Sequence, residues 1–121
     1  MKKYLFNFSE SKKLYENNKN IIEPKMCYNN IFAIVTKHIE KFTLREYRVA
    51  YGYVSSFGNL LARHCFIVDK NETVIDPNVF TTSNIKNREY YITKCFEMIN
   101  SYIDAIESEK RMSGIRTLFN K

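Results

Sequence analysis

The sequence has few residues that interrupt regular structure, with only 3 glycines, 2 prolines and no tryptophan among 121 residues. Long flexible linkers rich in glycine or proline are therefore not expected. Hydrophobic residues make up 45% of the chain, which is enough for an ordinary core and too much for a disordered protein. At this length we expect a single domain over residues 1–121, with its core at about residues 20–112.

Long apolar stretches are also missing. The longest run, Ile31–Val35, is far shorter than the roughly 20 residues that cross a bilayer, so no membrane association is expected. The N-terminal segment Met1–Asn7 turns polar too soon for the apolar core of a signal peptide. These observations together predict a soluble, cytoplasmic protein.

Cysteine is limited to three scattered residues, Cys27, Cys65 and Cys95. No Cys-x-x-Cys pair exists, and no spacing of cysteine and histidine is typical of a zinc site. We therefore expect reduced thiols and neither a metal nor a cofactor. Cys65 and Cys95 fall within apolar patterns, so we expect them to be small buried hydrophobic residues.

The formal net charge is +6, but no dense basic tract is present. The basic residues are dispersed along the chain, which favours a solvated basic surface or an acidic protein partner. No recognisable motif supports nucleic-acid binding, although the charge alone leaves it open. The sequence does not indicate an oligomeric state.

Hydrophobic periodicity predicts an α+β domain. Apolar residues three and four apart indicate a central helix, and three strand-like stretches follow it. Gly52 lies inside the first of these strands and indicates a bulge or a close backbone approach. The expected elements are a short helix at 10–19 capped by Ser9, the central helix at 26–42, antiparallel strands at 48–55, 60–68 and 73–75, turns at 56–59 and 69–72, a polar loop at 79–87, a long helix at 88–111 and a tail at 115–121.

Cys27 lies in the first turn of the predicted central helix. Free backbone N–H groups and the helix dipole stabilise a thiolate there, and they can also hold a developing oxyanion. A cysteine nucleophile needs a base, and the chain offers only His38 and His64. His38 would lie about 16 Å further along the same helix, out of reach of the thiol. His64 is therefore the candidate base.

Asp76 is the candidate carboxylate that orients the imidazole. It lies 12 residues after His64, an even separation, so an odd-length hairpin loop or a bulge would place both on one face of the sheet. We predict a three-residue loop at Asp69–Asn71, with Asn71 in the left-handed conformation. Asp69 is the weaker candidate because a carboxylate in the turn should be solvated.

Four short segments, taken in this order, resemble the transglutaminase-like and papain-like superfamily of cysteine hydrolases, which includes small bacterial and phage members. That superfamily places its cysteine at a helix start, its histidine in a strand before a small residue and an aromatic one, and its aspartate before proline. The segments span roughly residues 26–80 and read Cys27-Tyr28-Asn29-Asn30, Tyr51-Gly52-Tyr53-Val54, His64-Cys65-Phe66-Ile67-Val68-Asp69 and Val74-Ile75-Asp76-Pro77-Asn78.

The resemblance implies a triad in which Cys27 is the nucleophile, His64 the general base and acid, and Asp76 the orienting carboxylate. It further implies a cysteine-dependent hydrolase or acyl transferase that acts on an amide or thioester of a protein or peptide, whether as peptidase, deamidase or transglutaminase. The chain departs from the usual pattern because no glutamine shortly precedes Cys27. The nearest upstream amide side chain belongs to Asn20.

An alternative function is left open by the sequence. The chain would then be a catalytically silent binding protein, for example one encoded by a phage, that keeps the hydrolase fold as a scaffold. Such a protein would dock on a host protein through a basic surface rich in tyrosine. The tyrosines that suit this interface are Tyr47, Tyr51, Tyr53, Tyr90 and Tyr91.

Overall fold

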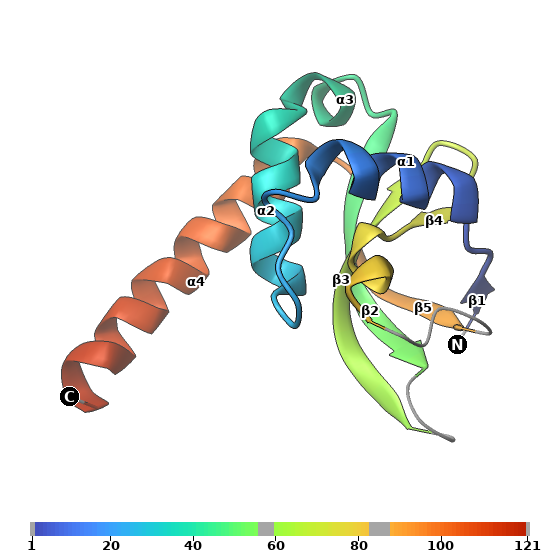
Figure 1. Ribbon diagram of the computed structural model, residues 1–121. Coiled ribbons are helices and arrows are strands. Elements are labelled where there is room, and N and C mark those ends of the chain that lie inside the picture. The colour runs from blue at the N-terminus through green and yellow to red at the C-terminus, as the bar shows by residue number, and fades with distance from the viewer. Residues whose placement is uncertain (1, 56–59, 83–87, 121) are drawn as a thin grey trace.

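The computed structural model describes residues 2–55, 60–82 and 88–120, with side chains as far as Glu109. Helices pack against one antiparallel sheet whose strand order is β1-β5-β2-β3-β4, so the predicted α+β class is confirmed (Figure 1). The elements are β1 (Lys3–Tyr4), α1 (Phe8–Asn18), α2 (Cys27–Lys37), α3 (Ile39–Thr43), β2 (Tyr47–Ser55), β3 (Leu61–Asp69), β4 (Val74–Ile75), the 3-10 helix η1 (Pro77–Thr81), β5 (Tyr90–Phe96) and α4 (Ile99–Asn120).

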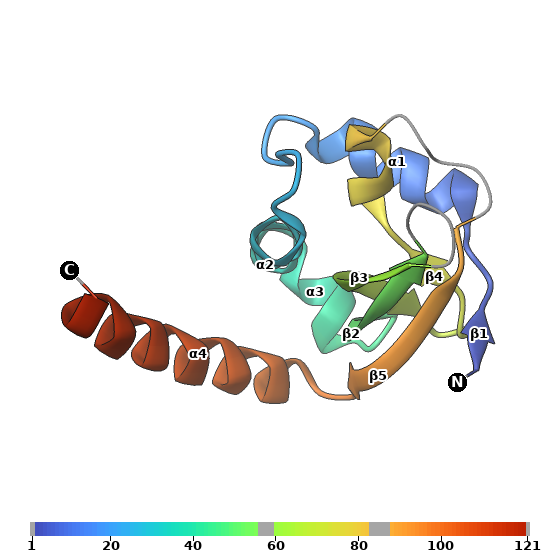
Figure 2. The ribbon, with the colours of Figure 1, turned by 90° about the horizontal axis from the view of Figure 1, so that it is seen from below.

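The sheet bends until its two edges almost meet, which gives it nearly the shape of a barrel (Figure 2). Phe6, just after β1, forms a parallel bridge to Val74 of β4. Val74 donates its N–H to the carbonyl of Leu5 at 2.7 Å and accepts the N–H of Asn7 at 2.8 Å. These bonds occupy backbone groups that an open sheet edge would leave unpaired.

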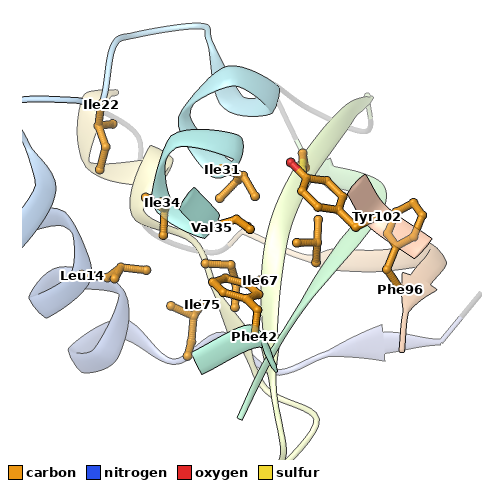
Figure 3. Packing of buried hydrophobic residues seen from close by; sticks show 12 residues of the cluster. Leu14, Ile22, Ile31, Ile34, Val35, Phe42, Ile67, Ile75, Phe96 and Tyr102 are labelled. Carbon is orange, nitrogen blue, oxygen red and sulfur yellow. The ribbon is translucent and has the colours of Figure 1, made fainter. Parts of the chain in front are cut away.

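Alternate residues of the strands face two separate cores, as the two-residue period of a strand requires. The inner core lies within the curve of the sheet. The outer core lies beneath the helices, and Figure 3 shows its residues. In β3, Phe66 and Val68 face inward, whereas Cys65 and Ile67 face outward. The buried residues of α2 that cover the outer face are Ile31, Ile34 and Val35.

The helix predicted at 26–42 is interrupted at His38. α2 ends at Lys37, His38 has non-helical angles of φ −119° and ψ 40°, and α3 begins at Ile39. The His38 ring instead makes a hydrogen bond of 3.0 Å between its Nε2 and Oδ1 of Asn18. The first helix also begins earlier than predicted, because Asn7 rather than Ser9 caps it by accepting the N–H of Glu10.

The largest error in the predicted fold concerns residues 88–111. A strand, β5, occupies the first part of this segment, and α4 then starts at Ile99 and runs through Gly114 into the predicted tail. The sheet therefore has five strands rather than three. β5 fills the space between β1 and β2, and that long-range pairing outweighs the helix-like spacing of its apolar residues. α4 extends away from the sheet (Figures 1 and 2).

Gly52 confirms the predicted close backbone approach. The register between β2 and β5 shifts between Tyr51 and Gly52, and a Cβ on Gly52 would lie 1.8 Å from the carbonyl oxygen of Tyr91. Any side chain at this position would therefore push β5 away. The turn predicted at 56–59 and residues 83–87 of the predicted loop lie outside the described residues.

Candidate active site

The structure brings Cys27, His64 and Asp76 together. His64 Nε2 and Asp76 Oδ2 are 2.8 Å apart, and the Cys27 thiol lies close enough to the His64 ring for the imidazole to lower its pKa. The three residues come from α2, β3 and the segment after β4. Asp76 is completely buried, and the His64 side chain is 11% exposed. A thiol, an imidazole and a carboxylate thus form one connected chain at the sheet.

Because β4 is short, Cys27 on the outer helix α2 can meet His64, whose side chain faces inward. β4 pairs only with Ile67 and Val68, so the part of β3 that carries His64 has no strand on that side in the described chain. The first turn of α2 lies against this part of β3. There Cys27 lies near the backbone N–H of Cys65 and the ring of His64, and both lower the pKa of its thiol.

The carboxylate of Asp76 accepts four hydrogen bonds. Its Oδ2 accepts from His64 and from the hydroxyl of Tyr90, at 2.8 and 2.7 Å. Its Oδ1 accepts from the backbone N–H and the side-chain amide of Asn78, both at 3.1 Å. A buried carboxylate satisfied in this way remains charged and cannot rotate freely, which suits a group that orients an imidazole.

The charges within the cluster shift all three pKa values. Burial alone would raise the pKa of Asp76, but the positive His64 and the hydrogen bonds outweigh it, so this pKa is lowered. Burial likewise opposes a charged His64, yet Asp76 and Cys27 raise the pKa of the imidazole to about 10. Burial also disfavours the Cys27 thiolate, but the hydrogen bond and charge of His64 lower the pKa of the thiol. The site therefore favours a thiolate–imidazolium pair.

The hydrogen-bond pattern also assigns the two nitrogens of His64. An ionised Asp76 can only accept hydrogen bonds, so Nε2 carries a hydrogen and donates it to the carboxylate. Nδ1 is then the ring nitrogen that remains for the thiol of Cys27. This arrangement allows one ring to exchange a proton with sulfur while it stays anchored at its other end.

The other two cysteines differ from Cys27. Cys65 is buried as predicted, and its burial raises the pKa of its thiol. Cys95 is only half-buried and lies in β5, so the prediction of a buried residue is wrong for it, and its pKa is also raised, mainly by burial. Of the three thiols, only that of Cys27 has a lowered pKa.

The hairpin loop has the predicted odd length but a different position. Asp69 donates its N–H to the carbonyl of Thr73, which leaves a three-residue loop at Lys70–Glu72. Glu72, not Asn71, takes the left-handed conformation, with φ 61°. The Asp69 carboxylate accepts hydrogen bonds from within the turn and is not part of the site. The odd length places His64 and Asp76 on the same face, as the sequence predicted.

Three residues of the site were not identified from the sequence. Tyr90 is completely buried and donates to Asp76, but its segment was taken for a helix, although the run of aromatic and β-branched residues at 90–93 is also typical of a strand. Asn30 and Asn78 lie within the segments that carry the resemblance, yet no role was given to them. Asn30, one turn after Cys27, donates to Oδ1 of Asn78 at 2.8 Å.

Asn30 connects three parts of the site. Its amide oxygen accepts the N–H of Glu23 at 3.0 Å, and its amide nitrogen donates to the Glu23 carbonyl at 2.7 Å as well as to Asn78. The chain entering α2, the helix that carries Cys27 and the segment that carries Asp76 are thereby fixed relative to one another. From the other side, Ser11 of α1 accepts the backbone N–H of Asp76 at 2.9 Å.

The start of α2 provides donors for an oxyanion. The residue before it, Met26, is the N-cap and makes no side-chain capping bond within the described structure, so no side chain of Met26 occupies the first N–H groups of the helix. Asn20, the upstream amide noted in the sequence, is exposed in the turn after α1.

Searches of protein-family models, of curated proteins and of solved structures found no match to this chain. Within residues 2–55, 60–82 and 88–120, no group of three or more histidine, cysteine, aspartate or glutamate residues is placed to hold a metal ion. None of the helices described is long and apolar enough to cross a membrane. A function for the chain must therefore be inferred from its own residues.

Proposed function

We propose that the chain is a cysteine-dependent hydrolase or acyl transferase that acts on an amide or thioester of a protein or peptide. The observation that carries this proposal is that Cys27 lies beside His64, whose ring is hydrogen-bonded to the buried Asp76, and that the thiol has a lowered pKa and the imidazole a raised one. A nucleophile joined to a base, with the base held by a third group, is the arrangement that covalent catalysis requires.

In the first half of the reaction, the Cys27 thiolate attacks the carbonyl carbon and a C–S bond forms. The carbonyl oxygen becomes an oxyanion, which free N–H groups at the start of α2 are suited to stabilise. The His64 imidazolium then gives its proton to the leaving nitrogen or sulfur, and the bond from that atom to the carbonyl carbon breaks. The products are a free amine or thiol and an acyl group on Cys27.

In the second half, neutral His64 removes a proton from water or from an incoming amine. That nucleophile attacks the thioester, the C–S bond breaks, and Cys27 leaves as a thiolate beside a protonated imidazole. Attack by water completes a hydrolysis, and attack by an amine completes an acyl transfer. Throughout, Asp76 keeps the ring in position and stabilises its positive form.

Two of the tyrosines argue against the alternative function, a catalytically silent binding protein. Tyr90 is completely buried and bonded to Asp76, and the hydroxyl of Tyr51 is buried as well. Neither presents its hydroxyl to a partner. Tyr47, Tyr53 and Tyr91 are each half-buried.

Alkylation with iodoacetamide tests the proposal without any knowledge of the substrate. We expect selective modification of Cys27 near neutral pH, located by mass spectrometry. In His64→Ala the rate at about pH 6.5 should fall about 100-fold, because a thiol of ordinary pKa is only about 1% ionised there. His38→Ala is the matched control, since His38 lies in the helical layer and bonds to Asn18 instead.

Acylation provides the catalytic readout. An activated ester such as p-nitrophenyl acetate should release nitrophenolate and leave an acetyl group on Cys27, and Cys27→Ser should not be acetylated at that position. Equal, slow alkylation of all three cysteines, or a Cys27 rate that is unaffected by His64→Ala, would overturn the proposal. Fast alkylation without acetyl transfer would instead support the silent scaffold.

A further inference from the structure

A groove opens beside the first turn of α2, the turn that carries Cys27. It has a volume of about 290 Å³, and its walls combine tyrosines with one cation. Arg63 precedes His64 in β3, so its side chain lies on the outer face of the sheet, where α2 packs, whereas the His64 ring faces inward. Tyr28 follows Cys27 in α2, and a molecule in this groove that lies against Tyr28 would reach the thiol from the outer face. The residues that line it are Tyr28, Tyr51, Gly52, Tyr53, Arg63 and Thr93.

Arg63 differs from Arg45 and Arg48, which are both held by Glu97. The guanidinium of Arg63 makes no ion pair or hydrogen bond within the described residues, and its side chain is exposed. A free guanidinium at the wall of a groove presents a planar set of donors that fits a carboxylate.

The position of this charge is supported by its effect on Tyr28. Burial, with the nearby Cys27 and Cys65 thiols, raises the pKa of Tyr28, and the positive Arg63 acts against that rise. Glu109 of α4 is the carboxylate that also acts on Tyr28, but it makes no ion pair with Arg63 in the described structure. The cation is therefore close to the wall formed by Tyr28 and available to a ligand.

From these observations we infer that the substrate carries an acidic side chain, a glutamate or aspartate, close to the carbonyl that Cys27 attacks. This inference rests on the proposed function. The tyrosine rings would pack against the methylene stem of that side chain, and Arg63 would bind its carboxylate. Arg63 is thus a specificity-determining residue rather than a catalytic one.

Peptide alkylating agents that differ only in charge test this inference. Iodoacetyl-glutamate amide and iodoacetyl-glutamine amide have nearly the same size, and in each the carbon that carries iodine bonds to the Cys27 sulfur as iodide leaves, so the whole reagent becomes attached. We expect the glutamate reagent to react about threefold to fivefold faster, as a partly exposed ion pair allows. Arg63→Gln should remove this preference, Arg63→Lys should keep part of it, and Arg45→Gln should leave it unchanged.

A third reagent distinguishes a side-chain carboxylate from the C-terminal carboxylate of a peptide. Iodoacetyl-glutamine with a free acid terminus should react no faster than its amide. If it alone is favoured, or if the glutamate preference survives in Arg63→Gln, the inference is wrong. Selective alkylation of Cys27 by neutral iodoacetamide separates these outcomes from a failure of the proposed function, because that reagent makes no demand on Arg63.

Binding can be measured without the thiol as well. In Cys27→Ser, acetyl-glutamate amide should shift the backbone NMR signals of Arg63 and Thr93 at lower concentration than acetyl-glutamine amide does. Equal titrations with the two ligands would overturn the inference even if the protein lacked a reactive thiol.

Discussion

Two clusters of opposite charges lie toward the two ends of β3, and they differ in burial. At one end, His64 binds the completely buried carboxylate of Asp76. At the other, Arg48 is bound by Glu72 and Glu97, whose side chains are 53% and 57% exposed. Both clusters hold segments of chain together across the sheet. Each cluster acts on a thiol, Cys27 in the buried one and Cys95 in the exposed one, but only the pKa of Cys27 is lowered.

The difference in burial decides what each cluster can do. Water screens the carboxylates around Arg48, so each bond there contributes little and can break and reform. Water does not reach Asp76, and its charge raises the pKa of His64 against the effect of burial. The positive His64 in turn lowers the pKa of Cys27 and outweighs the opposing effects of burial and of the more distant Asp76 charge. The same attraction between opposite charges therefore links the surface at one end and maintains a reactive thiolate at the other.

Removing the buried carboxylate should produce the largest effect on stability. Asp76→Ala leaves His64, Tyr90 and Asn78 without their buried acceptor, and we expect it to lower the free energy of unfolding by about 3–5 kcal/mol. Urea denaturation measures this loss. Because a domain of this size has a total stability of about 5–15 kcal/mol, the variant will have little stability left.

Asp76→Asn provides a second variant in case Asp76→Ala fails to fold. It keeps the shape of the side chain but removes the charge, so the pKa of Cys27 should rise and its alkylation should slow near neutral pH. An unchanged alkylation profile in Asp76→Asn would show that the carboxylate does not act on the thiol through His64.

The part of the fold that the sequence predicted has strong local patterns. The three strands that became β2, β3 and β4 were located within one or two residues, because alternation, turn residues and apolar runs are properties of the local chain. β5 was missed because Ile92 and Phe96 are spaced as on a helix. Its strand conformation depends on β1 and β2, which are far away in the sequence.

The site shows the same division. Cys27, His64 and Asp76 could be selected because few residue types can perform this chemistry, and the parity of the hairpin placed two of them on one face. Tyr90 and Asn30 could not be found in this way, since hydrogen bonds such as those to Asp76 and Asn78 follow from packing of the completed fold. The exact residue in the left-handed turn position likewise depended on the pairing of Asp69 with Thr73.

The pH dependence of stability provides a finer comparison of the two clusters. In Cys27→Ala, His64 still faces Asp76, and its raised pKa adds stability that is complete below 6.5 and is lost as pH rises through that pKa, which lies below the wild-type value of about 10 because the contribution of Cys27 is gone. The double variant Cys27→Ala/His64→Gln should lack this loss. Urea denaturation at several pH values across this range measures the difference between the two variants.

The wild type should be flatter than Cys27→Ala over the same range. Folding there moves a proton from the thiol to the imidazole and takes up none from solution, so the raised pKa of His64 and the lowered pKa of Cys27 offset each other. A wild type that loses as much stability as Cys27→Ala would argue against a thiolate–imidazolium pair.

The exposed cluster should give the smallest effect. Glu97→Gln removes one carboxylate from Arg48, which stays bound to Glu72 at 2.6 Å and to the carbonyl of Asp69 at 3.1 Å. Because Glu97 is 57% exposed, we expect a loss of about 0.5 kcal/mol or less in the free energy of unfolding. Even this difference should shrink at about 0.5 M salt, where charges on the surface are screened.

Alkylation of Cys27 separates the two clusters most directly, because it should be the same in Glu97→Gln as in the wild type. If Glu97→Gln instead cost more than about 1.5 kcal/mol, the surface cluster would be as tightly coupled to the fold as the buried one. If it slowed alkylation, charge would be transmitted along β3 from Arg48 to His64. Either result would show that burial is not what distinguishes the two clusters. The comparison holds only if the exposed carboxylates do no more than link surface segments while the buried carboxylate of Asp76 favours ionisation of a nucleophile.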